Sequence, residues 1–366
     1  MKIVIINSVG FWSMGWATDP ESQQDVVNAL KRLGVAVGVE EVASKAQLEQ
    51  LLLTLQTDSD CLVWPNAYQV AAFEGSEESV WLADVVAEHQ IPMIGNSAQT
   101  LKSVMLKDEC QRILQRHGVA VPSFCAIEQG QLGQLTQHIE EHSLTFPLFV
   151  KPNALSTSKG ITQKSVVYNA QELADQVVKA SNEFGFPVMV EEYLPGQDIT
   201  VAVFMTPDAP QILATYYDTE IYDTPNAVLD YDIRQRDWND GKWLRVVSDR
   251  AMLDQIAAVV IPACEALNVT EFTRIDCRLD RHGRLKAFDV NGLPGLELPF
   301  STTVWQMIVK LSHKPQLEAF DTLLSLIMYC AGHRHGVRVP APIYTLATDY
   351  IRDESCELLQ TCQELA

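Results

Sequence analysis

The sequence lacks the features that mark several large classes of protein. No stretch approaches the roughly 20 unbroken apolar residues that span a bilayer, and the short apolar run of MKIVIINSVG is interrupted by Asn7, Ser8 and Gly10, where a signal peptide would continue. The 8 cysteines contain no CxxC pair and mostly lie in apolar segments, which is typical of buried side chains and argues against a zinc site. We therefore expect a cytoplasmic protein without membrane contact.

Positive charge is scarce. Lysine and arginine together number 27, against 47 aspartate and glutamate residues, which gives a formal net charge of −20 and a pI near 4.7. A surface this acidic repels phosphate backbones, so we expect no nucleic-acid partner. Any site for a small phosphate-bearing ligand must therefore gather its own lysines, arginines, backbone N–H groups and divalent metal ion.

The chain of 366 residues is long enough for two or three domains, and its composition is ordinary for a soluble globular protein. Residues 1–97 alternate apolar strands with amphipathic helices, which predicts an α/β domain with a small doubly wound parallel sheet. The segment IPMIGN should be its last strand. Loops that follow such strands usually form a ligand crevice, and GFWSMGW and PNAYQVAAFEG have this position.

Residues 98–190 and 191–366 form two further regions that mix helices with strands. The first should open with one continuous helix, SAQTLKSVMLKDECQRILQRHG, which is closed by Gly118. The second should contain strands, a long polar stretch over about 218–245, a helix and a hairpin. The tail beyond about residue 335 is less readable, and we expect a terminal helix that packs on the body.

A predicted hairpin over residues 274–295 (RIDCRLDRHGRLKAFDVNGLPG) carries oxygen-bearing side chains. Its turn places Asp276 and Asp289 on neighbouring strands, and Asn291, two residues after Asp289, points to the same face. Magnesium prefers such carboxylate and amide oxygens. The alternative is a pair of exposed carboxylates, but the Gly-Leu-Pro-Gly that follows Asn291 places this residue at the mouth of a site.

The segment PLFVKPNALSTSKG (147–160) predicts a buried strand that delivers Lys151 to a loop rich in serine, threonine and glycine. Backbone N–H groups and hydroxyls in such a loop cradle phosphate oxygens, while the lysine neutralises them. The loop is not a Walker A motif, because GxxxxGK[ST] is absent. A solvated Ser/Gly turn is the alternative.

A second apolar strand, in VMVEEYLPGQDITVAVF (188–204), ends in Glu191, Glu192, Tyr193 and Leu194 and is followed by Asp198. In a nucleotide site the backbone of this hinge and Glu191 would face the adenine, and Asp198 the ribose hydroxyls. As an isolated hairpin the segment would carry no functional information.

Taken in order along the chain, these motifs resemble the ATP-grasp superfamily and, within it, the D-alanine–D-alanine ligases. The lysine-and-serine loop, the hinge that ends in a glutamate, the "RID" strand and the "N-x-x-P-G" turn all have counterparts there, over roughly residues 90–300. The resemblance implies an ATP-grasp fold, in which an N-terminal doubly wound parallel sheet precedes two α+β subdomains that clasp ATP. It also implies an ATP-dependent, ADP-forming C–N ligase.

The resemblance assigns roles to the matching residues. The residues that it implies for ATP binding are Lys107, Lys151, Thr157, Ser158, Gly160, Glu191, Glu192, Tyr193, Leu194 and Asp198. Asp276, Asp289 and Asn291 would hold Mg²⁺ or Mn²⁺, with one or two ions left open because most relatives have a glutamate where Asp289 stands. Arg274 would stabilise negative charge on an acyl phosphate and on the tetrahedral intermediate. Ser158 would belong to the loop that closes on the transferred phosphoryl group, and Lys242 to a lid that shields the intermediate from water.

The predicted substrate end departs from the family. The Gly-Gly-x-Ser-x-Glu element of D-alanine–D-alanine ligases, whose glutamate receives the first substrate's ammonium group, is replaced by SVGFWSMGWATDPESQQ, and LELPFSTT follows the Pro-Gly turn. We therefore expect a pocket that is not built for two D-alanines. Trp12 lines a site for a larger, flatter acid or packs in the core. Glu297 receives the ammonium group of an amino acid or is a solvated charge, and Ser301 completes the candidate set.

The predicted reaction starts with attack of a substrate carboxylate on the γ-phosphorus of ATP, and an amine then displaces phosphate from the acyl phosphate. It needs no side-chain nucleophile, which agrees with the lack of a Ser-His-Asp or Cys-His arrangement. We favour a specialised ligase that joins an amino acid to an acid, or to a vinylogous acid as in the mycosporine-like amino acid ligases. The alternatives are a true D-alanine–D-alanine ligase and a non-catalytic nucleotide-binding module. Relatives are commonly dimers, so a homodimer stays open.

Overall fold

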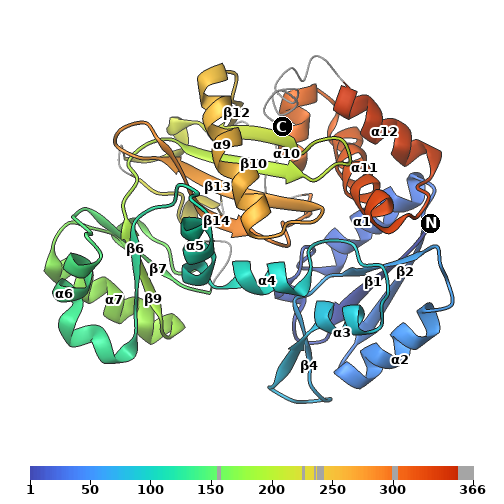
Figure 1. Cartoon of the computed structure of the whole chain (residues 1–366), viewed down its shortest axis with the longest axis horizontal. Coiled ribbons are helices and arrows are strands. Elements are labelled where there is room, and N and C mark those ends of the chain that lie inside the picture. Colours follow the sequence, from blue (N-terminus) through green and yellow to red (C-terminus); the bar gives the residue numbers. More distant parts are fainter. Residues whose placement is uncertain (155–157, 225–226, 235, 237–242, 299–303, 353–366) are drawn as a thin grey trace.

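The structure is a computed structural model of the 366-residue chain. It describes the whole chain except residues 155–157, 225–226, 235, 237–242, 299–303 and 353–366. Figure 1 shows the N-terminal part in blue and the central part in green at opposite ends of the molecule, with the C-terminal sheet between them. Among the described residues, no helix is both long and apolar enough to cross a membrane.

The N-terminal part contains the predicted parallel sheet, in the strand order β2-β1-β3. Its strands are β1 (Lys2–Ser8), β2 (Ala36–Val42) and β3 (Cys61–Pro65). β1 lies in the centre and is buried along almost its whole length, as its apolar sequence KIVIINS requires. The predicted strand IPMIGN forms only a single bridge, between Val63 and Met93, so the prediction of a full strand in this segment was wrong.

Helices and a short ribbon complete the N-terminal part. The helices are α1 (Pro20–Arg32), α2 (Lys45–Leu55) and α3 (Leu82–Glu88), and the ribbon consists of β4 (Gln69–Ala71) and β5 (Ser79–Trp81). α1 begins at a strong N-terminal signal, since the Asp19 side chain accepts a hydrogen bond from the Ser22 backbone N–H at 2.9 Å and a proline follows. The loop after β1 therefore ends at a carboxylate fixed on a helix N-terminus.

The helix predicted over residues 97–118 is in fact two helices, α4 (Ala98–Met105) and α5 (Lys107–Arg116). The break lies at Leu106, whose backbone is extended (φ −97°, ψ 115°). The first N–H groups of α5 bond to Asn153 instead of to α4: Lys107 N donates to the Asn153 backbone oxygen and Asp108 N to its side-chain oxygen. This exchange places Lys107 at the start of α5, next to the strand that carries Lys151.

The central part is a four-stranded antiparallel sheet with the order β6-β9-β7-β8. Its strands are β6 (Phe124–Ile127), β7 (Leu148–Pro152), β8 (Val166–Val167) and β9 (Val188–Glu192). The helices α6 (Leu135–Glu141) and α7 (Ala170–Phe184) pack on this sheet around Ile127, Val150 and Val177. The pairing of β7 with β9 brings the lysine strand beside the hinge strand.

The C-terminal sheet has the order β12-β11-β10-β13-β14 and is antiparallel. Its strands are β10 (Asp198–Phe204), β11 (Gln211–Tyr217), β12 (Leu244–Val246), β13 (Phe272–Leu279) and β14 (Leu285–Asn291). α9 (Arg250–Ala266) packs on this sheet and shares one apolar core with it. The hairpin expected over residues 274–295 is thus formed by β13 and β14.

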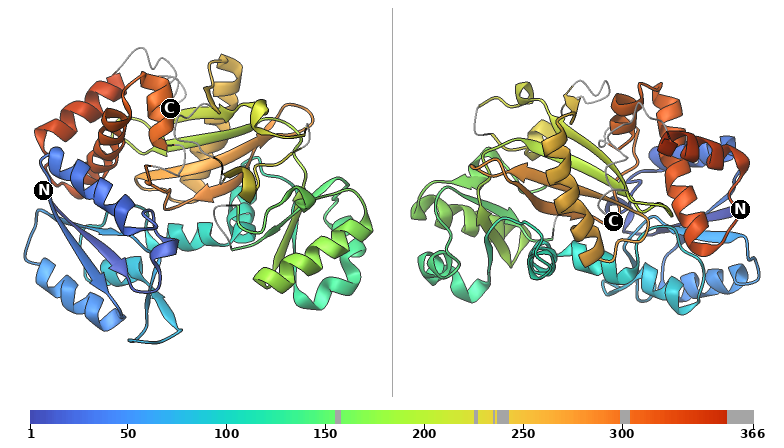
Figure 2. Two further views of the ribbon diagram at one scale, coloured as in Figure 1. Left: turned by 180° about the vertical axis from the view of Figure 1, so that it is seen from behind. Right: turned by 45° about the horizontal axis from the view of Figure 1, so that its top comes forward.

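The last helices connect the C-terminal sheet to the N-terminal part. They are α10 (Val304–Ser312), α11 (Gln316–His335) and α12 (Ala341–Arg352). α11 lies between α1 and β10, and its Phe320 shares a core with Ile5 and with Phe204. Figure 2 shows α11 and α12 beside the N-terminal strands in both views. The described part of the tail, α12, thus packs mainly on α11, and its Ile343 and Tyr350 join the core that contains Ile3.

Candidate functional site

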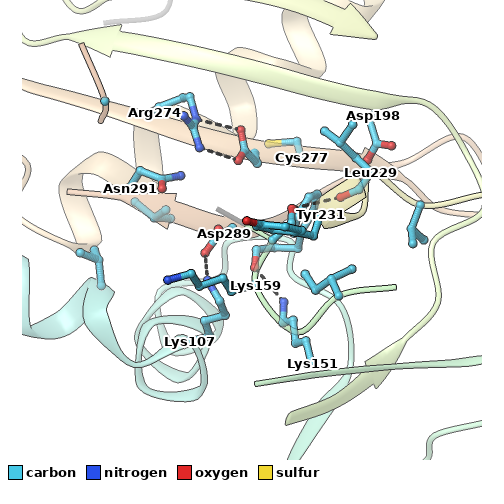
Figure 3. Close-up of a pocket in the computed structure, with 18 of the residues that line it drawn as sticks. Lys107, Lys151, Lys159, Asp198, Leu229, Tyr231, Arg274, Cys277, Asp289 and Asn291 are labelled. Carbon is cyan, nitrogen blue, oxygen red and sulfur yellow. Dashed lines mark hydrogen bonds and ion pairs between the residues drawn. The ribbon is translucent and has the colours of Figure 1, made fainter. Parts of the chain in front are cut away.

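All three parts of the chain line one large pocket of about 610 Å³. The central part contributes Lys107, Lys151 and the hinge, and the C-terminal sheet contributes residues of β13, β14 and the turn after them. The N-terminal loop contributes Ser13, Met14, Gly15, Thr18 and Asp19. Figure 3 shows Lys107, Lys151 and Lys159 on one side of this pocket, facing Arg274, Asp289 and Asn291 on the other. The cationic and the oxygen-rich motifs of the sequence therefore meet across one cavity.

The two predicted phosphate lysines are each paired with a carboxylate that lines the pocket. Lys107 Nζ lies 2.5 Å from Asp289 Oδ1, and Lys151 Nζ lies 2.8 Å from Glu191 Oε1. Lys151 also donates to the backbone oxygen of Phe288, at 3.2 Å. Burial would raise the pKa of Asp289, but the charges of Lys107 and Lys151 outweigh it and hold this pKa below its usual value. Asp289 therefore stays ionised.

The strand register places the hairpin side chains as their spacing predicts. Asp276 is directly opposite Asp289, and Arg274 is directly opposite Asn291. Arg274 donates two hydrogen bonds to Asp276, at 3.2 and 3.1 Å, and Thr200 donates a third to the same carboxylate, at 2.8 Å. The arginine and the carboxylate thus neutralise each other in the absence of a ligand.

The hinge lies at one end of the pocket. Glu191, Glu192, Tyr193 and Leu194 all line it, and Glu192 also pairs with Lys286 at 2.6 Å. Asp198 lines the same end, 3.5 Å from Arg278, and accepts a short hydrogen bond from the phenol of Tyr222. Burial, and then the negative charge of Asp198, raise the pKa of Tyr222, so the phenol keeps the proton that it donates.

Two loops meet over the pocket. Ser158 Oγ donates to the backbone oxygen of Leu229 at 3.1 Å, and the Gln163 side chain bonds to Asp230 and to both backbone groups of Val228. Gly160 has φ +78°, and a Cβ there would lie 2.6 Å from both Pro152 and Phe184, so no other residue fits without a shift. Gly160 thus shapes the loop without lining the pocket.

The substrate candidates have different surroundings. Glu297 lines the pocket and is only 7% exposed, and its Oε1 accepts a hydrogen bond from Thr18 at 2.7 Å. Trp12 is not a lining residue, and its indole N–H donates to Glu41 at 3.3 Å. Trp16 is buried and stacks on Trp64, with ring centroids 4.4 Å apart. The first-loop tryptophans thus form no aromatic wall of this pocket. Thr157, Lys242 and Ser301 lie outside the described residues.

The pocket also contains residues that the sequence motifs did not identify. Arg278 bonds to the backbone oxygens of Gly196 and Ala227 and lies over the Tyr193 ring, 5.5 Å from its centroid. The alternation of a strand could have found it, because Arg274, Asp276 and Arg278 are two residues apart and share a face. Tyr231 also lines the pocket, and Tyr222 contacts Asp198 without being a lining residue. Both come from a polar stretch with no periodic pattern, so no local signal marks them.

A divalent cation is compatible with the donor set at the hairpin. The described residues contain no cluster of three or more His, Cys, Asp or Glu side chains of metal-binding geometry. However, the carboxylates of Asp276 and Asp289 are neutralised by Arg274 and Lys107, cations that belong to the same pocket. The buried Nδ2 of Asn291 has no acceptor among the described residues. The carboxylate oxygens of Asp276 and Asp289 and the amide oxygen of Asn291 are ligands of the kind that Mg²⁺ prefers. The amide of Asn291 is not held by an acceptor among the described residues, so it is available to turn its oxygen toward an ion.

The fold and the arrangement of this pocket define an ATP-grasp protein. The sequence model of the family described as "D-ala D-ala ligase C-terminus" matches residues 113–309, so the chain belongs to this family. Its sequence is 26% identical over 251 residues to the D-alanine–D-alanine ligase A of Salmonella typhimurium, which covers 67% of this chain and 64% of the relative. The match thus spans somewhat less than two thirds of that relative.

Solved structures of related fold agree with this placement. The D-alanine–D-alanine ligase from Bacillus anthracis complexed with ATP has a TM-score of 0.63 at 16% identity, and the match covers 92% of this chain and 99% of that one. The VanG D-Ala:D-Ser ligase from Enterococcus faecalis has a TM-score of 0.60 at 19% identity, over 89% and 99% of the two chains. At these identities the likeness establishes the fold.

Proposed function

We propose that this protein is an ATP- and Mg²⁺-dependent ligase that joins a carboxylic acid to an amine through an acyl phosphate and forms ADP. The observation that carries the proposal is the pocket in which Lys107 and Lys151 face Asp276, Asp289 and Asn291. A triphosphate brings several negative charges and needs such a set of cations and metal ligands. Family membership supports the same activity.

Different residues along the pocket bind different parts of ATP and of the reacting groups. The backbone of the hinge and Leu194 hold the adenine, and Asp198 binds the ribose after its carboxylate releases the Tyr222 phenol. Lys107 and Lys151 neutralise the phosphates, and Asp276, Asp289 and Asn291 hold Mg²⁺, which supplies further charge neutralisation. Arg274 leaves Asp276 and stabilises the negative charge of the acyl phosphate and of the tetrahedral intermediate. Ser158 and Gly160 keep the loop above the reacting atoms.

Catalysis by this site consists of positioning and electrostatic stabilisation. Ser158 contacts Leu229 and Gln163 contacts Asp230, so the two loops that carry them are joined. Closure of these loops over bound ATP would exclude water from the reactive acyl phosphate. Thr157 and Lys242 remain predicted parts of the closing segments.

D-alanine is the first substrate to test, because the curated relatives are named for it. A second candidate is a specialised ligase that joins an amino acid to a larger acid or vinylogous acid, such as a mycosporine-type acceptor. This candidate is favoured by the first loop, where the family's glutamate element is replaced and Asp19 and Met14 line the pocket. Tyr68 also lines the pocket and adds an aromatic side chain to it.

The test measures phosphate release from ATP by the purified protein, with Mg²⁺ and pairs of one acid and one amine. D-alanine alone and a set of other acids, each with a panel of amino acids, separate the two candidates, and mass spectrometry identifies the product. We expect ADP and phosphate only when both partners are present. Release that never depends on an acid–amine pair would instead support a nucleotide-binding module without ligase activity.

A further inference from the structure

The ligase reaction has a chemical requirement that the ATP-binding residues do not meet. An aliphatic amine or amino acid has a pKa of about 8 to 10 and reaches the site at neutral pH as an ammonium ion. Only the uncharged amine has the electron pair that attacks the acyl phosphate. A group in the pocket must therefore bind the ammonium ion and take a proton from it.

Most carboxylates of the pocket are already committed to partners. Each of the following carboxylates forms a hydrogen bond or ion pair with the residue named after it: Asp19 with Ser22, Glu191 with Lys151, Glu192 with Lys286, Asp198 with Tyr222 and Arg278, Asp276 with Arg274, and Asp289 with Lys107. No histidine is among the described residues that line the pocket. Glu297 is different, because its Oε2 is buried and no described residue donates a hydrogen bond to it.

The Glu297 carboxylate is nevertheless held in place. Thr18 donates to its Oε1 at 2.7 Å, the indole of Trp305 donates to its backbone oxygen at 3.2 Å, and the preceding Leu296 N–H bonds to the Trp16 backbone oxygen at 2.8 Å. The side chain is 7% exposed and lines the pocket. A buried charged oxygen without a donor is costly, so it is expected to face a ligand that supplies one.

The order of residues along the hairpin and the contact of Glu297 with Thr18 indicate that Glu297 lies at the end of the pocket away from the hinge. Along β13, Arg278 pairs with Asp198 at the hinge end, Asp276 follows, and Arg274 lies furthest along, opposite Asn291. Glu297 follows the turn after Asn291. The lining residues from segments 13–19 and 295–306 include Asp19 and Glu297 and, among those described, no lysine or arginine. The negative side chains of this end therefore favour a cationic group such as an ammonium ion.

We propose that Glu297 binds the ammonium group of the amine substrate and acts as the general base that activates it. The proposal rests on the ligase function given above and assigns a residue to the step that follows acyl phosphate formation. One N–H bond of the ammonium ion breaks and its proton passes to Glu297 Oε2. The freed electron pair forms the C–N bond, and the C–O bond to phosphate breaks. The nitrogen's second proton leaves with the phosphate, and Glu297 returns its proton to solvent.

The test compares two nucleophiles in the wild type and in Glu297→Gln. D-alanine arrives protonated, whereas hydroxylamine is uncharged at neutral pH and attacks acyl phosphates without a base. With ATP, Mg²⁺ and D-alanine as the acid, we expect Glu297→Gln to lose about 10²- to 10⁴-fold in dipeptide formation and to keep hydroxamate formation within about threefold. Its dipeptide rate should rise about tenfold per pH unit below the pKa of the amine. Retained hydroxamate formation also shows that the variant is folded.

The matched control is Glu21→Gln, which removes the same charge from an exposed residue on α1 that does not line the pocket. Equal losses with both nucleophiles, or none with either, would overturn the role of Glu297. If the wild type forms neither product, the ligase proposal fails with this acid. The ammonium site is then tested separately by calorimetry with D-alanine, ADP and Mg²⁺. Binding at least about tenfold weaker in Glu297→Gln supports the site, and equal binding refutes it.

Discussion

The two ends of the pocket are built in opposite ways. At the hinge end, charged side chains neutralise one another across neighbouring strands, as in the pairs of Lys151 with Glu191 and of Arg278 with Asp198. At the substrate end, Glu297 and Asp19 come from segments far apart in the sequence, and an oxygen of Glu297 lacks a donor among the described residues. The first end is preorganised for a polyanion with metal ions, and the second is left open for a cationic group.

The largest expected effect concerns the buried pair at the hinge end. The Lys151 and Glu191 side chains are 2% and 5% exposed, so Lys151→Ala leaves a buried carboxylate without its cation. We expect a loss of about 3–5 kcal/mol in the free energy of unfolding, measured by denaturant titration without nucleotide. Lys45→Ala is the control, because its pairs with Glu49 and Glu88 are exposed and should contribute less than about 1 kcal/mol. Equal losses in the two variants would show that the hinge pair is not buried as described.

The next effect concerns the centre of the pocket. Arg274→Ala removes the cation that we assign to the acyl phosphate, and we expect turnover to fall about 10²- to 10³-fold. ATP affinity, measured by calorimetry, should change much less, because Lys107 and Lys151 remain. Arg250→Ala, on the exposed start of α9, controls for loss of an arginine. Unchanged turnover in Arg274→Ala would remove the arginine from the mechanism.

The contribution of Glu271, which bonds to Gly95 and Arg334, to the free energy of unfolding should depend on pH. Glu271 is fully buried, and burial, opposed by the Gly95 N–H group and Arg334, raises its pKa from 4.5 to about 7. The folded state therefore favours the protonated form, and its contribution to stability, complete below about pH 4.5, is lost as the pH rises through about 7. Relative to wild type, Glu271→Gln should gain up to about 3 kcal/mol between pH 4.5 and 7.5. A difference in unfolding free energy that stays constant over this range would contradict the shift.

The smallest effect concerns the ribose position. Tyr222→Phe removes the phenol that occupies Asp198, so ATP should bind about twofold to tenfold more tightly, by the net contribution of one hydrogen bond. Tyr344→Phe, on the exposed face of α12, should leave the affinity unchanged. Weaker binding in Tyr222→Phe would mean that the phenol itself contacts the nucleotide.

This difference between the ends also explains what the sequence could predict. Asp276, Asp289 and Asn291 lie on one hairpin, so local spacing was enough to bring them together. The parallel sheet of the N-terminal part likewise followed from its alternating pattern. These features depend on short-range periodicity, which a single sequence displays directly. The strands that carry Lys151 and Glu191 were predicted separately, and their pairing is shown only by the fold.

The remaining features depend on contacts between distant segments. The break between α4 and α5 arises because Asn153 supplies acceptors to the first N–H groups of α5, and no local residue signals this. The tryptophans of GFWSMGW were open to two interpretations, a ligand site or the core, and for Trp16 only the stacking on Trp64 shows that it packs in the core. The lack of a donor to Glu297 Oε2 among the described residues becomes visible only when the three-dimensional contacts of this side chain are known. Tertiary packing decides each of these cases.

Transfer of oxygen from the acid to phosphate tests the central claim most directly. Wild-type protein is incubated with ATP, Mg²⁺ and D-alanine whose carboxylate carries ¹⁸O, and the released phosphate and nucleotide are analysed by mass spectrometry. Attack of the carboxylate on the γ-phosphorus predicts one labelled oxygen in inorganic phosphate, together with unlabelled ADP. Product formation with unlabelled phosphate, or with label in AMP, would contradict an acyl phosphate formed between the lysines and the hairpin carboxylates.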